Sequence, residues 1–230
     1  MNAVAIETAT ETVAVAVRTG EGALAELALT GRRRHVETLV PALEHLLGQV
    51  GLVAGDLDVV AVDLGPGLFT GLRVGVATAK GLAEALGIGV LGFSSLEILV
   101  QAGRQAGHDE PVLAAVDARR GEVFATVAGP AGTRDLLAPG LFTPSALTQV
   151  LHGLGGTPLV AIGDGAQRYA DVWCGVPGVT VAEGLGFPPP ATLLALALAG
   201  DAAPVAPELI VPLYMREADA KSNFAQVDRA

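Results

Sequence analysis

The chain has 230 residues, of which 51% are hydrophobic and 17% are charged, with 30 glycines and a formal net charge of −10. This composition excludes an intrinsically disordered chain, and the acidic charge argues against direct, stand-alone binding of nucleic acid, which depends on Lys and Arg. The single cysteine, Cys174, excludes a disulfide framework and a multi-cysteine metal site. The length predicts two compact halves.

The first residues, MNAVAIETAT, lack the basic and apolar regions of a signal peptide. The apolar stretch TLLALALAG is much shorter than the about 18 residues that a membrane span needs. We therefore expect a cytoplasmic protein without a membrane partner.

The apolar periodicity of the first half predicts three strands followed by alternating helices and strands. The predicted strands cover 3–7, 12–18, 22–30, 59–64 and 89–93, and the predicted helices cover 35–50, 69–86 and 94–105. Pro41 lies inside the first helical pattern, so either the helix kinks there or Thr38 caps a helix that begins just before the proline. A polar, glycine-bearing stretch then indicates a boundary near 105–111.

The second half begins as the first does, with a buried strand that ends in a carboxylate, a five-residue turn and a second strand. The two carboxylates are Glu7 and Asp117. Further helices are predicted over 145–154, 166–174 and 189–200, with a strand over 158–165. We interpret this pattern as an imperfect internal duplication.

Two tandem β-β-β-α-β-α units match the ribonuclease-H-like arrangement of the actin and sugar-kinase fold, in which two α/β lobes enclose a cleft. We expect one lobe over 1–107 and a second, smaller lobe over 108–207. The segment 208–230 is expected to pack back on the first lobe. In such a fold the strand-end acids would face the interlobe cleft and position a metal-nucleotide phosphate.

This arrangement predicts a carboxylate pair across the cleft. The alternative is that each acid only caps the turn after it, since the turn TATET lacks the glycine run of a phosphate loop. The Gly-Pro-Gly turn at 65–67 precedes a helix N-terminus, which attracts anions, but it has neither Walker nor G-x-G-x-x-G spacing. The candidate nucleotide-binding residues are Glu7, Thr8, Thr10, Gly65, Gly67 and Asp117.

Two other features of the sequence bear on ligands. No two of the four histidines have the i, i+4 spacing of a helical metal site, so we expect no bound metal. The basic run Arg32-Arg33-Arg34 is either an RNA or anion contact or a solvated helix start.

Small residues recur every four positions in the helix predicted over 69–86. Its charged residues fall in one narrow band, so we expect a second helix to cover it in addition to its own sheet. That helix is either 35–50 of this chain or part of a partner, and both hold if the two helices form half of an intermolecular bundle. Gly75→Arg would abolish partner binding in the second case and unfold the monomer in the first. The predicted partner-binding residues are His35, Leu39, Leu43, Leu46, Thr70, Gly71, Leu72, Arg73, Gly75, Val76, Ala79 and Ala83.

Six motifs occur in a characteristic order and spacing: AIETAT, RRRHVETLVPALEHLL, GPGLFTGLRVGVATAKGLA, GVLGFSSLE, VDARRGEVF and PLYMRE. In them the chain resembles the TsaB (YeaZ) family of bacterial threonylcarbamoyladenosine biosynthesis proteins. Departures from the family pattern are small: Glu7 stands where many members have aspartate, and Leu68 where serine is usual.

The resemblance implies a pseudo-enzyme without catalytic residues of its own. It implies a subunit that binds and activates TsaD, the sister protein that transfers a threonylcarbamoyl group from its adenylate to N6 of adenosine 37 in tRNAs that read ANN codons. The ATPase TsaE would complete the complex, homodimers would form through a similar surface, and tRNA would be contacted mainly through the complex. No cofactor is implied, with ATP or ADP at the complex interface as the alternative.

In TsaD a His-x-x-x-His pair binds metal. The matching positions here are Ser95 and Leu99, a poor ligand and a non-ligand. Two hypotheses compete with the subunit role: an ATP-dependent phosphotransferase or ATPase that uses Glu7 and Asp117, and a metallopeptidase, which the missing histidine pair disfavours.

Overall fold

The computed structural model describes residues 1–31 and 35–216. The basic run at 32–34 and the C-terminal residues 217–230 lie outside these ranges. The hypothesis of an anion or RNA contact at Arg32, Arg33 and Arg34 therefore stays a prediction, as does the packing of the last residues.

The first sheet has five strands in the order β3-β2-β1-β4-β5. The strands are β1 (Ala3–Glu7), β2 (Thr12–Arg18), β3 (Leu24–Thr30), β4 (Val59–Asp63) and β5 (Gly89–Phe93). The first three pair antiparallel as a meander, and β1, β4 and β5 pair parallel. The short apolar strands β1 and β4 are buried along their whole length, as expected for strands covered on both faces.

The second sheet repeats this order as β10-β9-β6-β7-β8. Its strands are β6 (Val112–Arg119), β7 (Glu122–Ala128), β8 (Leu137–Phe142), β9 (Leu159–Ile162) and β10 (Val179–Val181). Strand β6 pairs antiparallel with β7 and parallel with β9, as β1 does with β2 and β4. The predicted α/β fold of two tandem actin-like lobes is confirmed.

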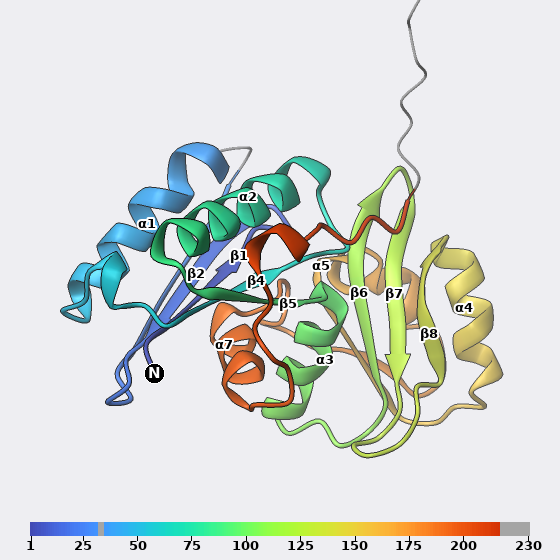
Figure 1. Cartoon of the computed structure of the whole chain (residues 1–230). Helices are drawn as coiled ribbons and strands as arrows, with labels where there is room; N and C mark the ends of the chain where they lie inside the picture. Colours follow the sequence, from blue (N-terminus) through green and yellow to red (C-terminus); the bar gives the residue numbers. More distant parts are fainter. Residues whose placement is uncertain (32–34, 217–230) are drawn as a thin grey trace, which may run out of the picture.

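The helices cover both sheets (Figure 1). They are α1 (His35–Gln49), α2 (Phe69–Leu86), α3 (Ser95–Gln105), α4 (Pro144–Gly153), α5 (Asp164–Arg168), α6 (Ala170–Trp173) and α7 (Pro190–Leu198), with short 3-10 turns η1 (Ala54–Asp56) and η2 (Pro207–Leu209). Helix α1 starts at His35 and continues through Pro41. Among the described residues, no helix combines the length and apolar character that a membrane crossing requires.

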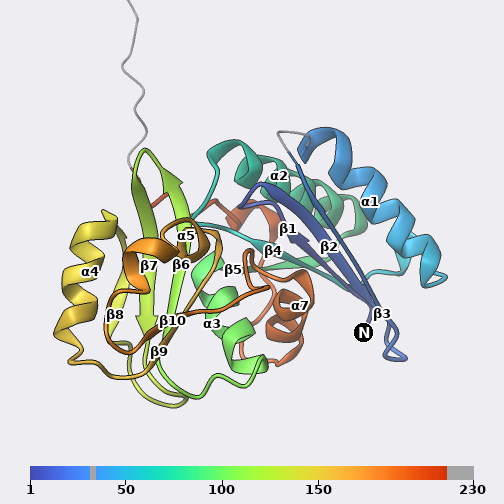
Figure 2. The ribbon, with the colours of Figure 1, turned by 180° about the vertical axis from the view of Figure 1, so that it is seen from behind.

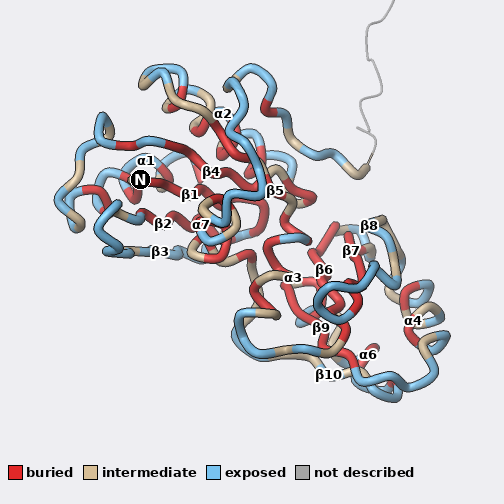
Figure 3. The backbone as a smooth tube through the Cα atoms, turned by 60° about the horizontal axis from the view of Figure 1, so that its bottom comes forward, coloured by how far each residue is buried: buried red, intermediate tan, exposed pale blue. Residues whose placement is uncertain are grey.

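Helices α1 and α2 lie side by side on one face of the first sheet, and α4 covers the outer face of the second (Figures 1 and 2). Between the two sheets lie α3 and α7, which contact each other. Helix α3 packs on the second sheet through Leu96 and Leu99. Helix α7, which falls within the predicted 108–207 lobe, packs instead on the first sheet through Leu193 and Leu194. The two halves therefore share a central helical layer, and buried residues run from β1 and β4 through to β6 (Figure 3).

The C-terminal segment crosses from one lobe to the other. The Lys80 side chain of α2 donates to the carbonyl of Ile210 (3.0 Å), and the amide of Leu213 donates to the carbonyl of Leu64 (2.7 Å). Farther along, the Arg216 guanidinium donates to the carbonyl of Ala118 at the end of β6 (3.0 Å). Residues 210–216 thus contact the first lobe and also link it to the second.

Candidate functional site

A buried pair of carboxyl groups lies at the ends of β1 and β4. Glu7 and Asp63 are both fully buried. Glu7 Oε1 accepts a hydrogen bond from the amide of Ala9 (3.0 Å), and Asp63 Oδ1 accepts from the amide of Gly65 and the hydroxyl of Ser95 (both 2.7 Å). The remaining oxygen of each carboxyl has no hydrogen-bond partner among the described residues, and the two groups interact, so one proton shared between them would satisfy both.

Burial raises the pKa of Glu7 well above its ordinary value, and the neighbouring Asp63 carboxylate raises it further. Burial likewise raises the pKa of Asp63. The folded state therefore holds protons that the unfolded chain releases above its ordinary carboxyl pKa. The contribution of the pair to stability is largest below that ordinary pKa and falls as pH rises through the raised values.

We expect Glu7→Gln to flatten this pH dependence and to raise the free energy of unfolding above pH 7 relative to the parent. The glutamine amide can donate to Asp63 at any pH, so no proton has to be bound. Urea unfolding between pH 4.5 and 8.5 measures the effect, with Glu26→Gln on the exposed strand β3 as control. An unchanged slope in Glu7→Gln would contradict the shared proton.

The predicted carboxylate pair across the cleft is wrong. Glu7 is paired with Asp63 inside the first lobe, because β1 and β4 are adjacent parallel strands and end side by side. Asp117, at the end of β6, forms ion pairs with Arg119 (2.9 Å) and Arg168 (3.5 Å) in the second lobe. Glu7 therefore has no surface from which to position a nucleotide.

A polar cleft of about 300 Å³ lies between the β1–β2 turn and the second lobe. Of the predicted nucleotide-binding residues, only Thr10 and Asp117 line it. Arg119 bridges its walls, with one guanidinium nitrogen 2.7 Å from Glu11 and another 2.9 Å from Asp117. The charged side chains of the two walls are thus already paired with each other.

The sequence reasoning missed Asp164 in this cleft. Its carboxylate accepts a hydrogen bond from the amide of Asp117 (2.9 Å). Asp164 is the first residue of α5, just after β9. Burial raises the pKa of Asp164 to about 6. The only signal was the GDG sequence at the end of the strand predicted over 158–165, a sequence that is as typical of a turn as of a binding site.

The other predicted anion ligands are occupied within the first lobe. The Thr8 hydroxyl donates to the carbonyl of Gly71 (2.8 Å), and the amide of Gly65 donates to Asp63. The amide of Leu68, at the start of α2, donates to the carbonyl of Ala9 (2.6 Å). The amide of Gly65 is thus bonded to the end of β4, and that of Leu68 to the turn after β1. Of the two predicted glycines, Gly67 lines a cavity.

The small-residue stripe of α2 faces its own sheet. A Cβ added at Gly71 would lie 2.0 Å from the carbonyl oxygen of Thr8, and one at Gly75 would lie 2.2 Å from the Thr8 hydroxyl. Ala79 and Ala83 are likewise buried in the first-lobe core. The interpretation of the stripe as a partner contact is wrong, because the close approach that it allows is between α2 and β1.

Most of the predicted partner-binding residues are buried for the same reason. Leu39, Leu43 and Leu46 of α1 enter the core, and His35 Nε2 lies 3.0 Å from the carbonyl oxygen of Thr10. The buried members are His35, Leu39, Leu43, Leu46, Gly71, Leu72, Gly75, Val76, Ala79 and Ala83. Only Thr70 and Arg73 are exposed. Helix α2 is also in contact with α1 and with the C-terminal segment.

Apolar side chains are nevertheless exposed on the outer side of α1 and α2. Val36 is 71% exposed and Val40 is 45% exposed. They are one helical turn apart, and Thr70 and Ala77 are exposed on the neighbouring α2. We call Val36, Val40, Thr70 and Ala77 the docking face.

The positions that match the metal ligands of the sister protein are packed. Ser95 is fully buried and donates to Asp63, and Leu99 is fully buried against the second sheet. Over residues 1–31 and 35–216, no group of three or more His, Cys, Asp or Glu side chains is placed to hold a metal ion.

These features define a two-lobed actin-like protein whose β1 acid is paired internally. A family model described as "TsaD: tRNA N6-adenosine threonylcarbamoyltransferase" matches residues 7–144. The chain belongs to this family, in its TsaB (YeaZ) branch, so the resemblance drawn from the sequence motifs is confirmed.

The relatives differ in how much of each chain is matched. The Haemophilus influenzae tRNA threonylcarbamoyladenosine biosynthesis protein TsaB is 37% identical over 122 residues, which cover 52% of this chain and 50% of that protein. An uncharacterized Mycobacterium tuberculosis protein is 34% identical over 219 residues, which cover 94% of this chain and 92% of that protein. The solved structure of YeaZ from Pseudomonas aeruginosa matches with a TM-score of 0.75 at 28% identity, covering 93% of this chain and 99% of that one. The chain spans about half the length of the first curated relatives that it matches.

Proposed function

We propose that the chain is a non-catalytic subunit required for N6-threonylcarbamoyladenosine (t6A) modification of adenosine 37 in tRNAs that read ANN codons. In this role it binds and activates the catalytic subunit TsaD and supports assembly with the ATPase TsaE in the cytoplasm. The names of its relatives, TsaB from several bacteria, support the pathway. With a net charge of −10, the chain would meet tRNA mainly through the complex.

The observation that carries this proposal is the docking face. Two exposed valines lie one turn apart on α1, and the neighbouring helix α2 exposes Thr70 and Ala77, so both helices contribute to an exposed surface. Such a surface is suited to packing against a pair of helices on another protein. A homodimer through the same face would compete with the complex.

The internal pairing of Glu7 argues against the ATP-dependent alternative. That hypothesis needs two carboxylates in the cleft, and the β1 carboxylate is buried beside Asp63. The packing of Ser95 and Leu99 argues in the same way against a metal-dependent reaction at the positions that match the TsaD histidines.

We expect the double variant Val36→Arg/Val40→Arg to weaken binding to the cognate TsaD on the order of 100-fold, because two charges would be buried at the centre of the contact. Sedimentation velocity on the purified pair measures the complex. Leu136→Arg/Val172→Arg is the matched control, since these side chains are 44% and 45% exposed in the second lobe, away from the docking face. Equal affinity of the docking-face variant and this control would contradict the proposed surface.

A further inference from the structure

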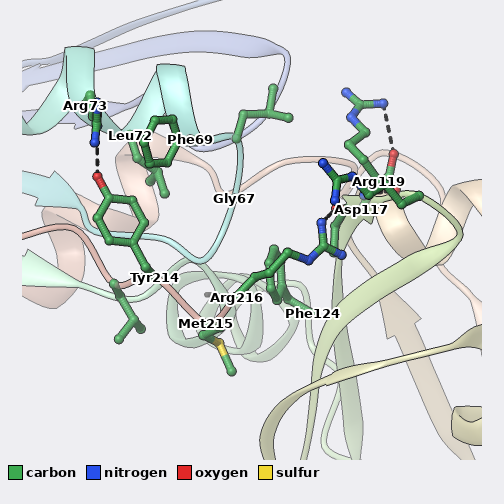
Figure 4. Close-up of a pocket in the computed structure, with 14 residues that line it drawn as sticks. Gly67, Phe69, Leu72, Arg73, Asp117, Arg119, Phe124, Tyr214, Met215 and Arg216 are labelled. Atoms are coloured by element: carbon green, nitrogen blue, oxygen red, sulfur yellow. Dashed lines mark hydrogen bonds and ion pairs between the residues drawn. The ribbon is translucent and has the colours of Figure 1, made fainter. Parts of the chain in front are cut away.

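A second cavity, of about 560 Å³, lies between the start of α2, the end of β6 and the C-terminal segment (Figure 4). Its walls are mainly apolar and come from both lobes, with Leu72 on the first-lobe side and Phe124 and Met215 on the second. A concave, largely apolar cavity of this size with a few polar groups is the usual form of a small-molecule site.

One cation on the rim is held in a fixed orientation. The Arg73 guanidinium carbon lies 3.8 Å from the centroid of the Phe69 ring, and Arg73 Nε donates to the Tyr214 hydroxyl (3.2 Å). The Phe69 and Tyr214 rings are themselves in contact, with centroids 5.3 Å apart. These contacts leave the two terminal nitrogens of the Arg73 fork without an acceptor among the described residues. A planar guanidinium held in this way is prepared for a carboxylate.

Three other charged residues that line the cavity, Asp117, Arg119 and Arg216, are already in ion pairs. Asp117 is paired with Arg119 and Arg168, and Arg216 is paired with Glu122. Arg73, by contrast, has no carboxylate partner within residues 1–31 and 35–216. An anion that enters the cavity therefore gains the Arg73 charge without displacing an ion pair.

We propose that this cavity binds an amphipathic carboxylate, with an aromatic or branched apolar body against Leu72, Phe124 and Met215 and its carboxylate at the Arg73 fork. The proposal does not rest on the subunit role, because the docking face is made of other residues. A free small molecule and an apolar-acidic residue pair of a polypeptide present the same chemistry, and the choice of probe distinguishes them.

The test uses the full chain and two matched probes, 3-phenylpropionate and the neutral 3-phenylpropanamide, in amide NMR titrations at neutral pH. We expect 3-phenylpropionate to bind with a Kd on the order of millimolar and to shift signals of Phe69, Leu72 and Met215. The amide should bind about 10-fold more weakly. If acetyl-Phe-Glu-amide binds more tightly than 3-phenylpropionate, the site is assigned to a polypeptide. If it binds more weakly, the site is assigned to a free small molecule.

Variants connect the binding to the guanidinium. The affinity of Arg73→Gln for 3-phenylpropionate should be about 10-fold lower than that of the parent, and its affinity for the amide should be unchanged. The affinity of Arg73→Lys for 3-phenylpropionate should lie between those of Arg73→Gln and the parent. Arg18→Gln, at the exposed end of β2, removes the same charge far from the cavity and should change neither. Equal binding of acid and amide, unchanged binding in Arg73→Gln, or shifts confined to other residues would overturn the proposal.

Discussion

Gly71→Ala is expected to lower the free energy of unfolding by about 3 kcal/mol, because the substitution forces a methyl group into a backbone contact. The added Cβ would lie 2.0 Å from the carbonyl oxygen of Thr8, so either α2 or the turn after β1 has to move. The Thr8 hydroxyl also donates to the Gly71 carbonyl, so movement costs that hydrogen bond as well. Equilibrium urea unfolding of the parent and the variant measures the change.

The same helix offers a matched control. Gly81 is exposed, and a Cβ built there meets nothing within 4 Å. Gly81→Ala should therefore stabilise the chain by up to about 1 kcal/mol through helix propensity alone. Opposite signs for one substitution at two positions of α2 would establish the contact with β1, and a similar change at both would contradict it. Gly75→Arg is expected to unfold the monomer, so it does not report on partner binding.

The bounds of α2 could be predicted from the sequence because its pattern is local. The turn at 65–67, the apolar period and Gly87, which ends the helix with a positive φ of 66°, all lie within a short stretch. Strands β8 and β10 were missed. The first carries Pro139 and Gly140 on a sheet edge, and the second has only three residues, so neither has a strong strand pattern.

The identity of the neighbours was the part that the sequence could not supply. A stripe of small residues permits close approach to a sheet or to a helix, and only the fold shows that Thr8 is what approaches Gly71 and Gly75. Glu7 and Asp63 meet because β1 and β4 pair across a long insertion, which no local pattern encodes. Val36 and Val40 fit the apolar period of the helix predicted over 35–50, but both side chains are exposed, so the apolar face of α1 is wider than the part that the sheet covers.

Complete dependence of t6A formation on this chain is the second large effect that we expect. The docking face would place α1 and α2 against TsaD, so the chain would act by holding its partner in an active arrangement rather than by touching the substrate. Its own β1 carboxylate is buried beside Asp63, and Ser95 and Leu99 are packed where the sister has metal ligands. The chain alone should therefore form no product.

Reconstitution with purified components tests this account most directly. Cognate TsaD, TsaE, threonylcarbamoyl-adenylate and an unmodified tRNA that reads an ANN codon are incubated with the parent chain, with Val36→Arg/Val40→Arg, with Leu136→Arg/Val172→Arg, or with no copy of the chain. The t6A formed is quantified by mass spectrometry of nucleosides. We expect product with the parent and the second-lobe control, and at most a few per cent of that amount with the docking-face variant or without the chain. Full modification in the absence of the chain, or product from the chain without TsaD, would contradict a non-catalytic activating subunit.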